Sequence, residues 1–148
     1  MSVSTVPPAI VALDWSSAGI TTAEDPPPPS IETAQIPMLY VLTGEADFDW
    51  ADIDQGWETR IYRVQVAVIP TTLATPETRE TRCRPVLVGV RGVLDSAPQL
   101  GQTRYIQSAT IVGDSGIAIL PEYNSKYVGF EIRLQVIEVF ARDFSSGE

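Results

Sequence analysis

The sequence predicts an α+β fold: a mostly antiparallel sheet of about five strands with one main helix packed on a face and an extended, proline-rich N-terminal segment. Two patterns lead to this prediction. Several segments alternate apolar and polar residues, as strands do, and one segment repeats apolar residues at helical spacing. With 148 residues, of which 44% are hydrophobic, the chain is long enough to bury one core. We expect one domain over residues 36–142, an N-terminal segment over 1–35 and a frayed C-terminus over 143–148.

Residues 1–35 are expected to be irregular. Pro7 and Pro8 come early, and the short apolar stretch Ala9–Trp15 suits either a strand or one or two helical turns. Residues 26–29 are four consecutive prolines, which favour an extended rod without internal hydrogen bonds. We interpret this rod as a stiff spacer, and an arm that lies on a partner is the alternative.

A long β-hairpin is predicted next. Residues 38–43 are apolar on both faces, which indicates a central strand. Residues 57–69 alternate, with Tyr62 and the valines that follow it on one face and mostly polar residues on the other. Between the two strands, residues 44–56 are expected to form an acidic loop at the tip of the hairpin.

The main helix is predicted to begin at Thr75 and Pro76, because threonine is a good N-cap and proline suits the first helical position. Apolar residues then recur at helical spacing. They are Cys83, Val86, Leu87, Val90, Val93, Leu94 and Ala97. Pro85 opposes a regular helix, since an interior proline costs about 3 kcal/mol. The sequence therefore predicts a helix that is kinked or starts late and that has ended by Pro98.

Three further strands complete the expected sheet. Residues 105–112 form the first, and residues 117–120 form a short second one after a turn at 113–116. A polar loop over residues 122–126 leads to the last strand, which has the clearest alternation. Its apolar face is Val128, Phe130, Ile132, Leu134 and Val136, and its polar face is Glu131, Arg133 and Gln135.

The composition excludes several classes of chemistry. The chain has no histidine and one cysteine, Cys83. Nucleophiles that need an imidazole base, an intrachain disulfide and a typical zinc site are therefore all excluded. There is no phosphate-binding glycine loop, so we expect no cofactor and no catalytic residue. We find no secretory leader and no apolar run near the ~18–20 residues that span a bilayer, so we expect a cytoplasmic product without membrane contact.

Residues 113–116 are Gly-Asp-Ser-Gly, the string around the nucleophile of chymotrypsin-like proteases. A serine hydroxyl is a poor nucleophile without a base to accept its proton, and the histidine that serves as this base is missing. Aspartate and glycine favour turns for ordinary backbone reasons. We therefore interpret the string as a connection between two strands.

The acidic loop carries four aspartates at short intervals. It lacks the central glycine and the ligand spacing of a calcium-binding loop, so we expect no metal. A solvated loop is the simplest interpretation, and an interaction loop is the alternative because exposed aromatic residues usually serve contacts. The aspartates are Asp47, Asp49, Asp52 and Asp54, and the aromatic residues between them are Phe48 and Trp50.

The charge is divided along the chain. Residues 1–59 contain ten acidic residues and no basic one, and the net charge of the chain is −9. A free-standing binder of nucleic-acid phosphates usually carries the opposite balance. Nine of the ten basic residues are arginine, which is enriched at protein interfaces, although a general bias toward arginine explains this as well.

From Pro76 onward, the order of elements and several short strings resemble a known family. A helix ends in Asp95–Gly101, residues 108–116 follow with their Gly-Asp-Ser-Gly end, and Ile117–Pro121 comes next. Tyr127–Glu131 then opens the long alternating strand. Over roughly residues 36–142 this pattern resembles the small head–tail joining proteins of long-tailed bacteriophages, and most of all their tail terminator, or tail completion, proteins.

The resemblance implies a virion structural protein made in the host cytoplasm. Tail terminators are α+β domains that form a ring, usually of six copies, on the end of the tail tube. The ring stops tube growth, meets the head connector or neck proteins and leaves a channel through which DNA passes without specific binding. That family commonly opens with an amphipathic helix, whereas this chain opens with a proline-rich segment. Another neck or tail-tube protein of the same virion and a small non-viral protein-binding module are the alternatives.

The charge division and the resemblance together suggest where copies meet. We hypothesise that the acidic loop over residues 45–54 of one subunit contacts arginines at the start of the main helix of the next. The candidate residues for a subunit or tube interface are Asp47, Phe48, Asp49, Trp50, Asp52, Asp54, Arg79, Arg82, Arg84, Tyr123 and Lys126.

Overall fold

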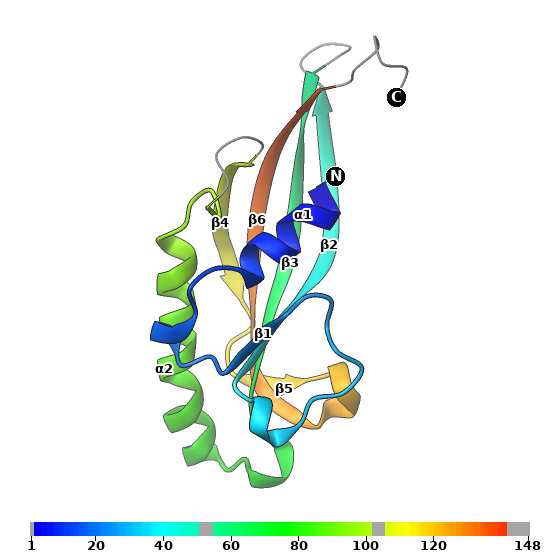
Figure 1. Ribbon diagram of the computed structural model, residues 1–148. Coiled ribbons are helices and arrows are strands. Elements are labelled where there is room, and N and C mark those ends of the chain that lie inside the picture. The colour runs from blue at the N-terminus through cyan, green and yellow to red at the C-terminus, as the bar shows by residue number, and fades with distance from the viewer. Residues whose placement is uncertain (1, 51–54, 102–105, 142–148) are drawn as a thin grey trace.

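The computed structural model describes residues 2–50, 55–101 and 106–141 (Figure 1). Its main elements are α1 (Ser2–Val11), β1 (Thr22–Glu24), β2 (Met38–Trp50), β3 (Gln55–Pro70), α2 (Pro76–Asp95), β4 (Ile106–Asp114), β5 (Ala118–Leu120) and β6 (Tyr127–Ala141). Short 3₁₀ helices lie between them, namely η1 (Ser16–Ala18), η2 (Thr33–Gln35), η3 (Thr71–Leu73) and η4 (Glu122–Ser125).

The strands of the described residues form one six-stranded sheet. Its order is β1-β2-β3-β6-β4, and the short β5 also pairs with β6. Every pairing is antiparallel except that of β1 with β2. Both α-helices lie on the same face of the sheet, α1 across β2 and α2 beside β4 (Figure 1). The predicted α+β class with a mostly antiparallel sheet is confirmed.

The main core lies between this face and the helices, and the alternation predicted for the two long strands is confirmed. The core side chains of β3 include Tyr62, Val64 and Val66, and those of β6 are Val128, Phe130, Ile132, Leu134 and Val136. From α2 the core receives Cys83, Val86, Val90 and Leu94. Because the two strands are directly paired over most of their length, one continuous apolar surface results.

The helix α2 begins where the sequence predicts. Thr75 caps it, because its side-chain oxygen accepts a hydrogen bond from the Thr78 backbone N–H at 3.2 Å. The helix does not start late, however, and it continues through Pro85 to Asp95. Pro85 is exposed. The backbone carbonyl that loses its hydrogen-bond partner there can therefore turn to water, which limits the cost of the proline.

The prediction that residues 1–35 are irregular is wrong for the first third of that segment. Residues 2–11 form α1, with Pro7 and Pro8 inside it. Val6 and Ile10 are four residues apart, and both side chains are fully buried against the sheet. The Trp15 indole N–H then donates to the Ile10 carbonyl at 3.0 Å. Burial of this apolar stripe offsets the helical hydrogen bonds that the prolines cannot make.

A smaller core on the opposite face of the sheet explains why residues 38–43 are apolar on both sides. It consists of Ile31, Met38, Tyr40, Ala67, Leu120 and Tyr127. The hydroxyl of Tyr127 donates to the Ile31 carbonyl at 2.7 Å, and the hydroxyl of Tyr123 donates to the Pro28 carbonyl. The segment around residues 26–31 is therefore folded onto its own domain and is not a free spacer, whereas the alternative of a contact with a partner stays a prediction.

The region predicted as an acidic loop over residues 44–56 is largely β-structure. β2 runs on to Trp50 and β3 begins at Gln55, so the two strands form a long hairpin whose far part extends beyond the helices (Figure 1). We call residues 44–50 and 55–60 the hairpin arm. The paired partner strand satisfies the backbone of this polar stretch on one side, which sequence periodicity alone does not reveal.

Candidate interaction surfaces

The hairpin arm presents different side chains on its two faces. Phe48 pairs with Glu58, and Trp50 pairs with Gly56. Paired residues share a face, so the two rings lie on the same face of the sheet as the α-helices, at the end that the helices do not cover. They remain 57% and 39% exposed. Asp47 and Asp49 alternate with the two aromatic residues and lie on the other face.

The two aspartates of the arm are exposed, and neither forms an ion pair with another described residue. The other predicted acidic residues, Asp52 and Asp54, lie outside the described residues. The arm thus leaves two aromatic side chains at the surface, which is typical of a contact surface, and the aspartates beside them suit a polar rim.

Two glutamates lie buried next to each other on the helix side of the arm. Glu58 and Glu138 are direct neighbours in the pairing of β3 with β6 and are only 6% and 4% exposed. The guanidinium of Arg60 donates to Glu58 Oε1 at 2.6 Å and to the carbonyl of Gly44 at 2.9 Å. Burial, and then the negative charge of Glu58, raise the pKa of Glu138 to about 7.

We expect Glu138→Gln to stabilise the protein at high pH. The pKa of Glu138 is above its ordinary value of 4.5 in the folded state. The folded protein therefore binds a proton more readily than the unfolded chain, and stability falls as pH rises from about 4.5 to about 7. The variant should gain about 1–3 kcal/mol above pH ~8 and nearly nothing below pH ~4. Urea unfolding at both pH values measures this, with Glu77→Gln on α2 as the control. An equal effect at both pH values would contradict the prediction.

The three arginines predicted at the interface lie together in the first half of α2. The guanidinium of Arg84 donates to Glu80 at 2.7 Å, an exposed pair of modest strength. Arg82 is exposed, and Arg79 is half-buried. The start of α2 and the end of the hairpin arm lie at opposite ends of the molecule (Figure 1). Any contact between the acidic arm and these arginines is therefore a contact between copies.

Tyr123 lies in η4 and Lys126 follows it directly, and η4 lies at the same end of the molecule as the start of α2 (Figure 1). Residues 123–125 have φ between 57° and 59°, a left-handed conformation that costs about 1–2 kcal/mol per residue. The hydroxyl of Tyr123 donates to the Pro28 carbonyl, and its ring meets that of Tyr40 edge-on at 5.6 Å. Tyr123 thus holds this strained turn in place, whereas Lys126 is exposed.

A chain of hydrogen-bonded polar groups crosses the face of the sheet opposite the two α-helices. The sequence did not reveal it. Glu131, which is 9% exposed, accepts hydrogen bonds from Arg63 at 2.7 Å and from the Gln65 amide at 2.9 Å. Gln65 in turn accepts one from the buried Tyr40 hydroxyl at 2.8 Å. Arg133, directly opposite Arg63, approaches the second oxygen of Glu131 at 3.4 Å. The alternation of these residues with apolar ones was visible in the sequence, but their pairing across strands was not.

In the described residues, the structure places Ser115 in a turn and Cys83 in the core. Ser115 donates to the Gly116 carbonyl at 2.8 Å and accepts from the Glu131 backbone N–H, so its hydroxyl is part of the predicted turn between β4 and β5. Cys83 is buried, and burial raises the pKa of its thiol to about 11. No group of three metal-ligating side chains occurs in the part of the chain that the structure describes.

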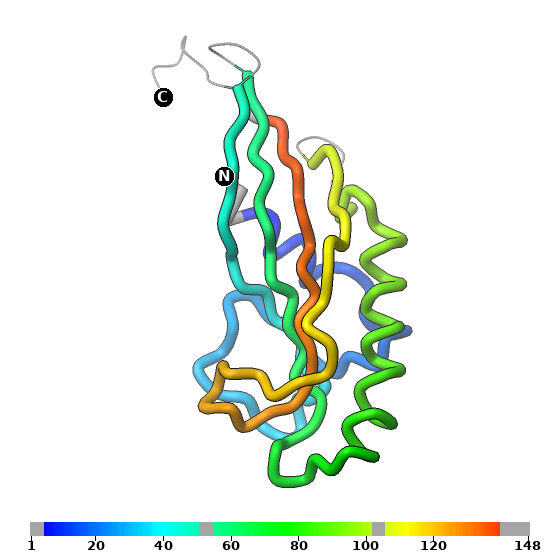
Figure 2. The backbone as a smooth tube through the Cα atoms, turned by 180° about the vertical axis from the view of Figure 1, so that it is seen from behind, coloured from blue at the N-terminus to red at the C-terminus, as the bar shows by residue number. Residues whose placement is uncertain are grey.

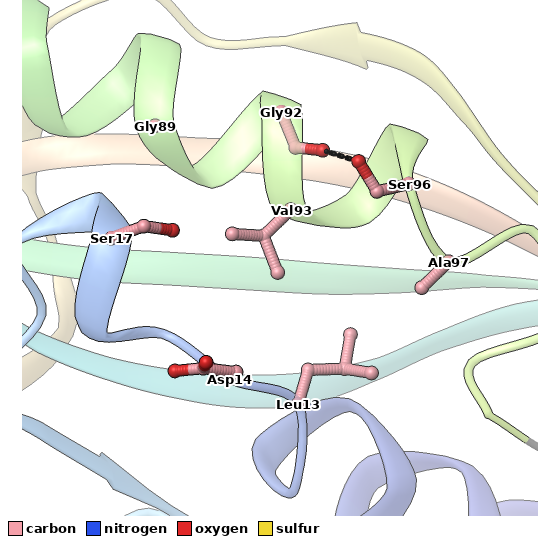
Figure 3. A pocket seen from close by; sticks show the side chains of 8 residues that line it. All are labelled: Leu13, Asp14, Ser17, Gly89, Gly92, Val93, Ser96 and Ala97. Atoms are coloured by element: carbon pink, nitrogen blue, oxygen red, sulfur yellow. Dashed lines mark hydrogen bonds between the residues drawn. The ribbon is translucent and has the colours of Figure 1, made fainter.

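An open groove of about 560 Å³ lies between α2 and the segment that follows α1 (Figure 3). Its lining is Leu13, Asp14, Ser17, Gly89, Gly92, Val93, Ser96 and Ala97. Gly89 sets the approach of the two segments, since an added Cβ there would lie 2.7 Å from the Cα of Ala18. A Cβ at Gly92 would meet nothing within 4 Å. The groove therefore exists because two glycines on one helix face allow a close contact at one point and leave space at the next.

Comparison with protein-family models and with curated proteins finds no match to this chain. The similarity to tail terminators therefore rests on the order of elements and the short strings quoted above, and it stays a prediction. No helix of the described residues is long and apolar enough to cross a membrane.

Proposed function

We propose that the protein is a structural subunit of the head–tail joint of a long-tailed bacteriophage. In this proposal its copies form a ring on the end of the tail tube, which stops tube growth and connects the tail to the neck. The observation that carries the proposal is the hairpin arm, because a domain that acts alone has little use for a polar projection with two exposed aromatic side chains.

The N-terminal helix adds support. The proline-rich start was the point at which the sequence departed from the family's pattern, which commonly opens with an amphipathic helix. With α1 formed and its apolar stripe buried on the sheet, the order of elements follows that pattern from the first residues onward. Fold does not decide function, so this similarity only raises the weight of the proposal.

The charge of the chain fits a ring through which DNA moves. Each copy contributes a net charge of −9, and an acidic channel repels phosphates and so lets DNA slide without binding. In the proposal the two faces of the ring meet the tail tube protein and the head connector. No catalytic role, cofactor or membrane contact is part of it.

Native mass and particle shape test the proposal. Light scattering after size exclusion, over a range of protein and salt concentrations, should detect a species near six copies of the 16.1 kDa chain, about 97 kDa. Electron microscopy of that species should show rings with a central hole. Long tubes would indicate a tube subunit instead, and a monomer or dimer up to the solubility limit would favour a small binding module.

The hypothesis about α2 makes a separate prediction. Replacing Arg79, Arg82 and Arg84 together with alanine should shift the ring toward monomer and make assembly more sensitive to salt, because charges that steer copies together are screened by ions. Native mass at low and at raised salt measures the effect. Thr81→Ala, at an exposed position of the same helix, is the control and should assemble normally. An unchanged ring would rule out a role for these arginines.

A further inference from the structure

We propose that the groove between α2 and residues 13–17 receives Phe48 and Trp50 from the hairpin arm of a second copy. This inference rests on the proposed ring and names the two surfaces that meet in it. Residues 13–17 and the second half of α2, which line the groove, lie apart from the far end of the hairpin arm in both views of the fold, so the contact joins different copies (Figures 1 and 2).

The groove has the shape and chemistry of a receptor for apolar side chains. Leu13 and Val93 point into it from opposite sides, and Ala97 extends the apolar surface (Figure 3). Gly92 adds no side chain, so there is open space above the helix backbone. The hydroxyl of Ser96 donates to the Gly92 carbonyl at 2.8 Å, which satisfies the polar groups of this wall. An apolar group that packs on this wall therefore displaces water without leaving the Ser96 hydroxyl or the Gly92 carbonyl unpaired.

The arm offers a matching pair of rings. Phe48 and Trp50 are two residues apart on one strand and on one face, which places them about 7 Å apart. The indole of Trp50 lies over Gly56, where an added Cβ would come within 2.9 Å of the ring. One side of the ring thus packs on its own strand, which restricts its motion, and a restricted aromatic group loses less entropy on binding.

Polar groups at the rim suit this occupant. The carboxylate of Asp14, which lines the groove, is exposed and stays in contact with water when an apolar group enters. Oδ1 of Asp14 accepts from Ser16 at 2.6 and 3.1 Å, which fixes the carboxylate in position. Arg82 and Arg91 on α2 are exposed and form no ion pair with another described residue, so this helix offers positive charge to the acidic arm.

A contact of this kind uses different surfaces on the two partners. Each copy that inserts its arm still has an empty groove, and each copy that receives an arm still has its own arm to place. Such contacts close into a ring when the rotation between neighbours allows it and otherwise continue as an open chain. A two-fold dimer in which each copy receives the other's arm would also use both surfaces, and native mass distinguishes it from a ring.

Two variants block the two surfaces separately. Gly92→Leu fills the groove from a helical position with free space around it, so the fold should be kept. Phe48→Ser with Trp50→Ser removes the rings from exposed positions of the arm. Each variant alone should raise the concentration needed for half-assembly by about 30-fold or more, as expected for the loss of a central contact. Thr81→Leu adds the same apolar side chain to α2 outside the groove and should assemble normally. Thermal unfolding verifies the fold of every variant.

Mixing the two blocked variants provides the decisive measurement. The groove-blocked chain has an intact arm and the arm-blocked chain has an intact groove, so together they should form a 1:1 complex of about 32 kDa that grows no further. If the wild type forms rings and Gly92→Leu forms the same rings, the inference is wrong and the proposed function stands. If the wild type stays monomeric and the mixture forms no complex, both are wrong. If the wild type forms open chains and the mixture forms the complex, the arm and groove meet but the closed ring is wrong.

Discussion

Gly129→Ala should cost more than about 3 kcal/mol of folding stability, the largest effect we expect from a single methyl group in this protein. A Cβ at residue 129 would lie 1.8 Å from the Val66 carbonyl oxygen and 3.3 Å from the Cα of Ala67. Both are backbone atoms of β3. The strand cannot move away from them, because β5 pairs with β6 at the same residue on its other side.

Urea unfolding followed by circular dichroism measures this loss. A domain of this size is stable by about 5–15 kcal/mol, so the variant should unfold at a much lower urea concentration or fail to fold at all. Gly113→Ala is the matched control, since its Cβ would meet only the end of the flexible Arg133 side chain at 3.3 Å. The control should change stability by less than about 1 kcal/mol. Equal stability of the two variants would show that the β3–β6 contact is looser than described.

Glu131→Ala should cost about 2–4 kcal/mol near neutral pH. The variant leaves the buried Gln65 amide without its acceptor. It also leaves the guanidinium groups of Arg63 and Arg133 opposite each other without the carboxylate that both approach. Arg133→Ala is the control, because its contact is longer and its side chain is 47% exposed, so its loss should cost less than about 1 kcal/mol.

The loss in Glu131→Ala should depend on pH. Burial raises the pKa of Glu131, but hydrogen bonds from Gln65 and Arg63, together with the charges of the two arginines, outweigh burial and hold the pKa below its ordinary value of 4.5. The stabilisation from the carboxylate is therefore fully present above about pH 4.5 and is lost as pH falls through the lower folded-state pKa. The wild type and the variant should approach each other in stability in acid. A difference that stays constant down to pH ~2 would mean that the carboxylate acts through packing and not through charge.

The periodicity of apolar residues identified the elements that keep one face buried along their whole length. β3 and β6 alternate because one face is buried under the helices, and α2 repeats Val86, Val90 and Leu94 for the same reason. The N-cap at Thr75 depends only on residues within one turn and was also predictable. Burial that repeats at a regular spacing leaves a pattern in the sequence, and these elements were predicted close to their observed bounds.

The elements that were mispredicted are those stabilised by distant residues. α1 contains two prolines, which local rules count against a helix. It forms because Val6 and Ile10 are buried against the sheet. The hairpin arm is rich in aspartate, which local rules assign to loops, and it is a strand because β3 supplies its hydrogen bonds. In both cases tertiary contacts outweigh local propensity.

Of the two candidate surfaces, the sequence predicted the arm, and only the tertiary structure revealed the groove. The acidic and aromatic residues of the arm were found from the sequence because exposed Phe48 and Trp50 among aspartates are unusual there. The groove was not found, since it depends on Gly89 meeting Ala18 and on the space left at Gly92. Glycines carry no chemistry that a sequence pattern can report, and their effect appears only when another segment packs against them.

By itself, then, the sequence determined the α+β class, the two long alternating strands, the main helix and the absence of histidine-dependent chemistry. Only the tertiary structure decided that the N-terminus is a helix packed on the core, that residues 44–50 and 55–56 of the expected acidic loop are paired strands and that a groove opens beside α2. The physical reason is that regular burial of one face produces a periodic pattern of apolar residues within a short stretch of sequence. Close contacts and shared hydrogen bonds such as those of Glu131 depend on residues far apart in the chain, which no local pattern brings together.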